Sequence, residues 1–324
     1  MSIIHRLALV ALACCAKVSH SAFAADAPAR VPVILDTDIG DDIDDTWALV
    51  MMLKSPQLDV KLITTTCGKS VYRAKIIAKL LTIAKRTDIP IGLGAGGQEG
   101  TGGQAPWVKD YKLSDFSGKI HDDGVQALIA TVKESRQPIS IVSIGPSHTV
   151  AAALQRDPSI APMAIFVGMQ GSVRKGYNGG RVKAEYNVRA NVPAAQKVFS
   201  APWQQAVITP LDTCGLVRLS GARFQRLMES DDALVKALME NYQIWSKNRK
   251  RAESSVLFDT VAIYLAYPGT RPLVELEELK LRVSADGKTV IDPAGAKFLT
   301  ATRWKDLDGY LDLLTNTLAG SRTP

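Results

Sequence analysis

The sequence contains few cysteines, four among 324 residues. Two of them, Cys14 and Cys15, lie in an apolar N-terminal segment, which leaves Cys67 and Cys214 for the rest of the chain. One pair does not make a disulfide scaffold, so the class of small secreted domains held together by several bridges is excluded. An oxidising compartment would permit a bridge between Cys67 and Cys214, but their positions in the sequence do not determine it.

Repeats, low-complexity segments and flexible linkers are also missing, and the apolar run Leu7–Ala16 is too short to cross a membrane. With 46% hydrophobic and 22% charged residues, the composition excludes a disordered, collagen-like or polytopic membrane chain. Lys and Arg total 39 against 32 Asp and Glu, a formal net charge of +7. Because the basic residues are scattered, a generally basic secreted protein is favoured over one that binds nucleic acid.

Residues 1–24 have the pattern of an export signal. A weakly basic start precedes the apolar run, and Ala22-Phe23-Ala24 is an A-x-A cleavage pattern. We therefore expect a mature chain of residues 25–324 that is periplasmic or secreted and does not associate with a membrane once the signal is removed.

Strand and helix patterns alternate along residues 25–324. Short, continuous apolar runs such as Val31–Leu35 are typical of buried parallel strands. The alternation predicts one α/β domain with a mostly parallel central sheet flanked by helices, an open Rossmann-type architecture in which ligands bind beyond the carboxyl ends of the strands. Strands are predicted at 31–35, 60–66, 89–93, 139–144, 163–169 and 206–209, a hairpin at 279–291 turning at Asp286-Gly287, and helices at 46–54, 71–86, 124–134, 193–199, 223–251, 256–267 and 307–318.

An acidic loop directly follows the first predicted strand. Asp36–Asp45 places six carboxylates within ten residues. Helix capping explains one or two of them, but the mutual repulsion of six would oppose folding unless positive charge neutralises it, and a hard cation with oxygen ligands would do so. An EF-hand is excluded, because the twelfth position from Asp36 is Trp47 and not a closing glutamate. An aspartyl phosphatase, which also begins with Asp-x-Asp after a strand, stays open as an alternative.

Val33–Gly40 followed by Asp44–Leu49 resembles the opening of the inosine-uridine preferring nucleoside hydrolase family. That family usually has a D-x-D-P-G start and an Asp-Asp pair two residues after the glycine; here Ile39 replaces the proline and the pair comes two residues later, so that Asp42 or Asp44 could take the first place of the pair. Three further segments resemble the family in the same order, and together they extend over about residues 31–315: Ser143–Pro146, Ala184–Asn187 and Phe258–Thr260.

The resemblance implies calcium-dependent hydrolysis of the N-glycosidic bond of ribonucleosides, in their salvage, to free base and ribose. It implies that Asp38 is a calcium ligand and the general base that activates a metal-bound water. The other implied calcium ligands are the carboxylates of Asp45 and Asp259 and the carbonyl of Ile144. The implied substrate-binding residues are Asp44, Asn178, Glu185 and Asn187, with Asp36 and Asp42 supporting the site from behind. The implied partner is a small ribonucleoside and not a nucleic acid, and the implied assembly is a homodimer or homotetramer.

Glu185 and Asn187 alternate along what is predicted to be an extended stretch, so both side chains are expected on one face. Trp47, Trp107, Tyr177 and Trp245 are the aromatic side chains that could stack on a base.

The chain also departs from the family pattern. Many members carry a histidine just before the late aspartate, proposed to protonate the departing base, and this chain has Phe258 there. His121 and His148 are expected to be a loop residue and a helix-face or capping residue. Lys69, where the family often has asparagine, could bind a carboxylate or a phosphate, but it is expected simply to face water. These departures leave base preference open and keep a non-catalytic periplasmic protein that binds nucleosides or sugars as an alternative.

Overall fold

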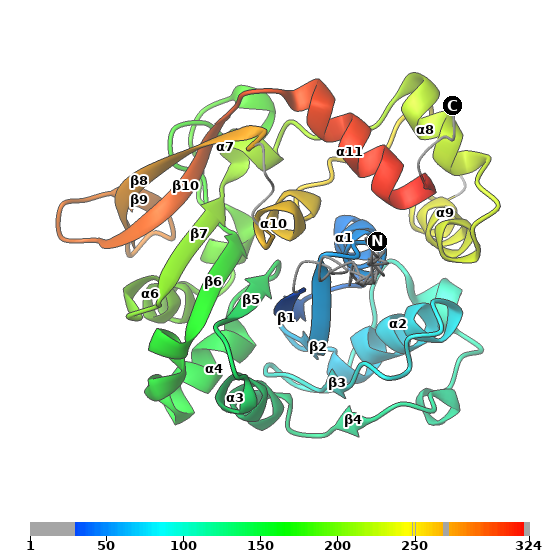
Figure 1. Cartoon of the computed structure of the whole chain (residues 1–324), viewed down its shortest axis with the longest axis horizontal. Coiled ribbons are helices and arrows are strands. Elements are labelled where there is room, and N and C mark those ends of the chain that lie inside the picture. Colours follow the sequence, from blue (N-terminus) through cyan, green and yellow to red (C-terminus); the bar gives the residue numbers. More distant parts are fainter. Residues whose placement is uncertain (1–29, 248, 250, 268–271, 321–324) are drawn as a thin grey trace, which may run out of the picture.

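The computed structural model of the chain describes residues 30–247, 249, 251–267 and 272–320. The predicted export signal, 1–24, lies outside these residues. Ten strands form one sheet in the order β4-β3-β2-β1-β5-β6-β7-β10-β8-β9, and helices pack against it (Figure 1). The strands are β1 (Val31–Thr37), β2 (Leu58–Thr65), β3 (Ile91–Gly92), β4 (Ile120–His121), β5 (Ile139–Ser143), β6 (Ala164–Met169), β7 (Gln205–Thr209), β8 (Val274–Val283), β9 (Thr289–Ile291) and β10 (Ala296–Trp304).

The sheet is mostly parallel, as predicted. Every pairing from β4 through to β10 is parallel, and only β8 pairs antiparallel, with β10 on one side and β9 on the other. The helices are α1 (Asp44–Leu53), α2 (Ser70–Ile83), α3 (Gly124–Glu134), α4 (His148–Arg156), α5 (Tyr186–Arg189), α6 (Val192–Ser200), α7 (Leu211–Cys214), α8 (Gly221–Met228), α9 (Ala233–Trp245), α10 (Thr260–Leu265) and α11 (Leu307–Ala319).

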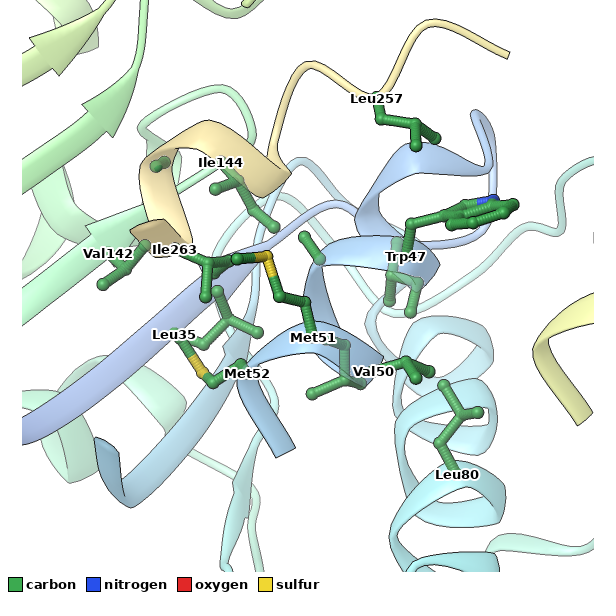
Figure 2. Packing of buried hydrophobic residues seen from close by; sticks show 14 of the residues in the cluster. Leu35, Trp47, Val50, Met51, Met52, Leu80, Val142, Ile144, Leu257 and Ile263 are labelled. Atoms are coloured by element: carbon green, nitrogen blue, oxygen red, sulfur yellow. The ribbon is translucent and has the colours of Figure 1, made fainter. Parts of the chain in front are cut away.

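Both faces of the central strands are buried, which explains the continuous apolar run of β1. Successive side chains of a strand point to opposite faces, so Val33 and Leu35 join one core cluster with α1 and α2, while Ile34 joins a second cluster with α3, α4 and α6. Figure 2 shows Leu35 near Met51 and Met52 of α1, whereas Val50 lies toward Leu80 of α2. This packing holds the end of β1, and the loop that follows it, in a fixed place.

The structure corrects several predicted elements. The helix predicted at 223–251 is two helices, because Asp232 begins α9 by accepting hydrogen bonds from the backbone N–H groups of Leu234 and Val235. The helix predicted at 256–267 is shortened to α10. The hairpin with Asp286-Gly287 is present, with Gly287 at φ 75°, but β8 begins earlier than predicted and pairs with β10, a strand that was not predicted.

Among the described residues, no helix combines the length and the apolarity that a membrane crossing requires. Cys67 is half-buried, Cys214 is buried, and both are free thiols.

Candidate active site

The candidate site lies at the carboxyl ends of three neighbouring strands. Asp38 follows β1, Ile144 follows β5, and Met169 ends β6, and these strands are adjacent in the sheet in the order β1-β5-β6. All three residues line a cavity of about 330 Å³. The place of the cavity agrees with the rule for open parallel sheets used above.

Three carboxylates converge in this cavity. Asp44 and Asp45 open α1, whereas Asp259 immediately precedes α10, and one oxygen from each lies within 4.8 Å of the others. They meet because α1 and α10 lie side by side (Figure 1). The Asp259 side chain makes no capping hydrogen bond to α10, so a helix-cap role does not account for this residue.

Burial raises the pKa of Asp44, Asp45 and Asp259 well above the usual range, and repulsion from neighbouring carboxylates raises it further. Such a cluster of buried acids is costly without a compensating cation. The donor set consists entirely of oxygens, with the carbonyl-bearing residue Ile144 lining the same cavity. These residues therefore fit a hard divalent cation.

Asp38 lines the same cavity but is not one of the three closest carboxylates. The resemblance implies Asp38, Asp45 and Asp259 as the metal-binding carboxylates. The three closest carboxylates instead include Asp44, which the resemblance assigns to sugar binding, and not Asp38. Burial raises the pKa of Asp38 to about 6, while the attraction of Arg73 acts in the opposite direction. A Cβ at Gly145 would lie 2.5 Å from the Asp38 Oδ1 atom, so the missing side chain at Gly145 leaves space for this carboxylate.

Thr37 positions Asp45 from the last residue of β1. Its hydroxyl donates a 2.5 Å hydrogen bond to the Asp45 carboxylate and accepts one from the backbone N–H of Ile39 at 3.1 Å. The same residue thus links the acidic loop to the first turn of α1.

Arg73, on α2, fastens the acidic loop from behind, and the sequence reasoning missed it. The side chain is 1% exposed. Its guanidinium donates to the Asp38 carbonyl, to the Ile39 carbonyl at 2.9 Å and to the Asp41 carboxylate at 3.0 Å, and also to the carbonyls of Gly68 and Cys67. Part of the positive charge that the six aspartates require therefore comes from the protein. The one sign of this role in the sequence is an arginine in the first turn of the apolar helix pattern at 71–86, and that pattern does not reveal its partners.

Lys69 also pairs with the loop. Its ammonium lies 2.6 Å from the Asp41 carboxylate, so Lys69 binds a carboxylate, the alternative given above, and does not simply face water. Asp41 thus carries two cationic partners, Lys69 and Arg73, and its charge is neutralised within the protein.

Replacing Arg73 by Met is expected to lower the free energy of unfolding by about 3 kcal/mol or more, because it leaves several buried carbonyls without their donor, and each such loss costs about 1–3 kcal/mol. Urea denaturation measures this loss. Arg86→Met is the matched control: Arg86 pairs with Asp88 at the surface, and exposed pairs contribute about 0–1 kcal/mol. Equal losses for the two variants would contradict the role given to Arg73.

Glu185 and Asn187 both line the cavity, but the expectation of an extended stretch is wrong. Glu185 caps the short helix α5: its carboxylate accepts hydrogen bonds from the backbone N–H groups of Asn187 at 2.8 Å and Val188 at 3.3 Å, and from that of Gly171 at 3.0 Å. Burial raises the pKa of Glu185 to about 7, against the lowering effect of these N–H donors. Glu185 therefore joins the loop after β6 to α5.

Asn187 connects two strand ends. Its side-chain nitrogen donates to the Ile144 and Met169 carbonyls, each at 3.0 Å. The Ile144 carbonyl, implied above as a metal ligand, is thus also a hydrogen-bond acceptor for Asn187. No partner for the Asn187 amide oxygen is found among the residues that the structure describes, so this oxygen is free to accept a bond from a ligand.

The remaining sequence-predicted residues lie in different places. Asp36 is fully buried behind the cavity and accepts a hydrogen bond from the Thr64 hydroxyl at 2.7 Å. Asp42 is exposed and lines the cavity. Asn178 is exposed, has a left-handed backbone with φ 50°, and is not part of the cavity lining. Its neighbour Tyr177 lines the cavity instead.

Among the four aromatic side chains considered for stacking, Tyr177 alone lines the cavity. Trp47 and Trp107 are buried in the core, and the Trp245 indole donates to the Asp41 carbonyl at 3.1 Å. Phe258 also lines the cavity and was identified above only as a departure from the family.

The model of the inosine-uridine preferring nucleoside hydrolase family matches residues 33–308. The chain belongs to this family. The chain is 30% identical over 322 residues to the pyrimidine-specific ribonucleoside hydrolase RihA of Salmonella agona strain SL483, covering 89% of this chain and 98% of the relative. RihA of Salmonella enteritidis PT4 is also 30% identical, over 320 residues, with the same coverage of both chains.

Solved structures support the fold. The plant nucleoside hydrolase PpNRh1 superposes with a TM-score of 0.75 at 23% identity, covering 90% of this chain and 99% of that one. An inosine-guanosine nucleoside hydrolase superposes with a TM-score of 0.72 at 20% identity, covering 89% and 99%. The predictions of the family, of a single mostly parallel α/β domain and of an N-glycosyl hydrolase are confirmed. Family membership does not support the aspartyl-phosphatase alternative.

In this nucleoside hydrolase, histidine is missing from the described cavity lining. His148 is the first residue of α4 and His121 lies on β4, and neither lines the cavity. Phe258 stands before Asp259 with its ring edge-on to Tyr177, at 5.7 Å between centroids. The described cavity lining therefore holds no histidine that could protonate a departing base.

Proposed function

We propose that this chain is a calcium-dependent ribonucleoside hydrolase in which Asp38 is the general base. The observation that carries the proposal is the shared cavity: Asp38, Asp45 and Asp259, from distant parts of the chain, line it together. The similarity to pyrimidine-specific relatives supports pyrimidine ribonucleosides as substrates of this chain.

The metal would be held by Asp45, Asp259 and Asp38 with the Ile144 carbonyl, and Asp44 is close enough to contribute. An all-oxygen set with several carboxylates favours calcium over zinc or copper, which take nitrogen and sulfur ligands more readily. When bound, the cation would orient the sugar diol and lower the pKa of the attacking water.

The protein's own side chains carry out the remaining steps of the proposed reaction. Asp38 takes the proton from the water as its oxygen approaches the anomeric carbon. The buried carboxylates around the ring stabilise the positive charge of the oxocarbenium-like transition state. Asn187 offers its free amide oxygen to a sugar hydroxyl, and Glu185 fixes the helix from which Asn187 projects.

Removal of calcium is expected to abolish hydrolysis. The measurement is sugar release from uridine, cytidine, inosine and nicotinamide riboside, before and after treatment with a chelator, followed by addition of calcium or zinc. Calcium should restore turnover and zinc should not, because the site lacks nitrogen and sulfur donors. Full activity in chelator would contradict the metal-dependent proposal. Binding of these ribonucleosides without turnover of any would instead favour the non-catalytic binding protein.

The location and the assembly are part of the same proposal. The pattern of residues 1–24 supports export, with action in the periplasm or outside the cell. Family resemblance supports a homodimer or homotetramer that takes a small ribonucleoside and no nucleic acid. Cell fractionation and light scattering after size exclusion test these two statements separately.

A further inference from the structure

The mouth of the active-site cavity differs chemically from its floor. The floor carries buried carboxylates, whereas the less buried part of the lining carries Tyr177, Tyr186, Phe258 and Arg189 together with the acids Asp41 and Asp42. Tyr177 is 42% exposed and Tyr186 is 45% exposed. Two large aromatic rings beside a sugar-sized acidic pocket form a surface on which a planar base can lie.

Arg189 is the only cationic residue that lines the cavity in the described part of the chain. Its guanidinium lies over the Tyr186 ring, 5.5 Å from the centroid. Its side chain makes no ion pair and no hydrogen bond with any described residue. A cation at the mouth of a cavity lined by carboxylates, with none of them as its partner, has its donors free for a ligand.

Two neighbouring features hold Arg189 in place. Glu185 caps α5, of which Arg189 is the last residue, and so sets the direction of the helix. The β8–β9 turn covers the start of the side chain, since a Cβ at Gly287 would lie 3.0 Å from the Arg189 Cβ. The guanidinium is therefore presented to the mouth by a supported backbone.

The departing base needs help that the other residues of the cavity do not provide. Both Glu185 oxygens already accept backbone N–H bonds, and Phe258 has no proton to give. Burial raises the pKa of the Tyr177 phenol and of the Tyr186 phenol, which makes both poorer acids. In addition, the aspartates of the floor disfavour negative charge on a leaving group.

We propose that Arg189 is a catalytic residue that stabilises the departing base as an anion, through a charge-assisted hydrogen bond to the carbonyl oxygen beside the glycosidic nitrogen of a pyrimidine. The inference rests on the proposed hydrolase function. The C1′–N bond breaks, and its electron pair passes to the base and spreads onto that carbonyl oxygen. The water oxygen bonds to C1′, and its proton goes to Asp38. Arg189 keeps its protons throughout, and the base takes a proton from solvent after release.

This role makes the effect of Arg189 depend on the charge of the leaving group. Uracil departs from uridine as an anion and needs the guanidinium. Nicotinamide departs from nicotinamide riboside as a neutral molecule, because its ring is cationic in the substrate, and it needs no such help. The two substrates share the same ribose, so a change at the sugar site affects both alike.

The test compares Arg189→Met with the wild-type protein on both substrates, in saturating calcium. We expect kcat/KM for uridine to fall about 100-fold, the size of losing one charge-stabilising donor, and kcat/KM for nicotinamide riboside to stay at the wild-type value or rise. Arg189→Lys should recover part of the uridine activity. Arg181→Met is the matched control, an exposed arginine between β6 and α5 in the chain that does not line the cavity, and the rates for both substrates should stay unchanged.

Equal losses on the two substrates would overturn the inference, because they would show a structural role for Arg189. No loss on either substrate would also overturn it, as would a loss confined to uridine 5′-monophosphate, which would make Arg189 a phosphate-binding residue. Failure of the proposed function looks different: the wild-type protein would then hydrolyse neither uridine nor nicotinamide riboside.

Discussion

Asp38→Asn is expected to lower kcat for uridine by about 10³-fold, within the range of 10²–10⁴ that general acid–base catalysis contributes. The amide has the shape of the carboxylate but cannot take the proton of the attacking water. The variant should stay folded, since Arg73 binds the backbone carbonyl at this position and not the side chain. Folding is checked by urea denaturation, and kcat is measured in saturating calcium so that weaker metal binding does not limit the rate.

The control for this variant is Asp110→Asn, a carboxylate at the surface with 89% of its side chain exposed. It should retain the wild-type kcat. A wild-type rate in Asp38→Asn with the same substrate would remove Asp38 from the reaction and leave the cavity without its proposed base.

Asp259→Ala is expected to weaken calcium binding at least 100-fold, more than the roughly 10–100-fold loss that follows when only a residue behind the ligands is changed. Asp259 comes from a segment distant in sequence from the acidic loop that supplies Asp44 and Asp45. The loop has other aspartates that could take over from Asp44 or Asp45, but Asp259 has no such neighbour in the sequence. Titration calorimetry with calcium measures the effect, and unchanged affinity would remove Asp259 from the metal site.

The variant Asp259→Asn conserves the shape of the side chain and is tested by thermal stability, on which it should have opposite effects without and with calcium. Without calcium it should be more stable than the wild-type protein, because one of three mutually repelling buried carboxylates is neutralised. With calcium the order should reverse, because the wild-type protein gains binding free energy that the variant loses. Thermal unfolding with and without calcium measures both; Asp110→Asn should follow the wild-type protein in each.

The place of the site followed from the sequence because two strong signals coincide there. The run Val33–Leu35 is apolar without interruption and so marks a strand buried on both faces, and six aspartates follow it within ten residues. Packing rules for parallel sheets then place the loop at a ligand site. The prediction that Asp45 and Asp259 lie close together rested on the resemblance of several segments to the family motifs, and not on any local sequence pattern.

The features that were missed or misassigned either depend on contacts between segments distant in sequence or lie in very short segments. Arg73 was missed because its five acceptors belong to residues from 38 to 68, and helical periodicity says nothing of them. The helix at Tyr186–Arg189 has only four residues, too few to show a period, so Glu185 was taken for a strand residue and not for its cap. The strand Ala296–Trp304 was missed since its exposed Lys297 and Arg303 interrupt the apolar pattern.

The contacts of Arg73 also bear on the order of two events, the folding of the acidic loop and the binding of the proposed metal ion. The guanidinium joins α2 to the carbonyls of Asp38 and Ile39, so the acidic loop has an internal brace that is covalently part of the chain. We therefore expect the acidic loop to take its shape before the proposed calcium ion binds, so that ion binding is a later and reversible step. Concentration of the free ion would then govern how many molecules work at a given moment, and not how many have matured.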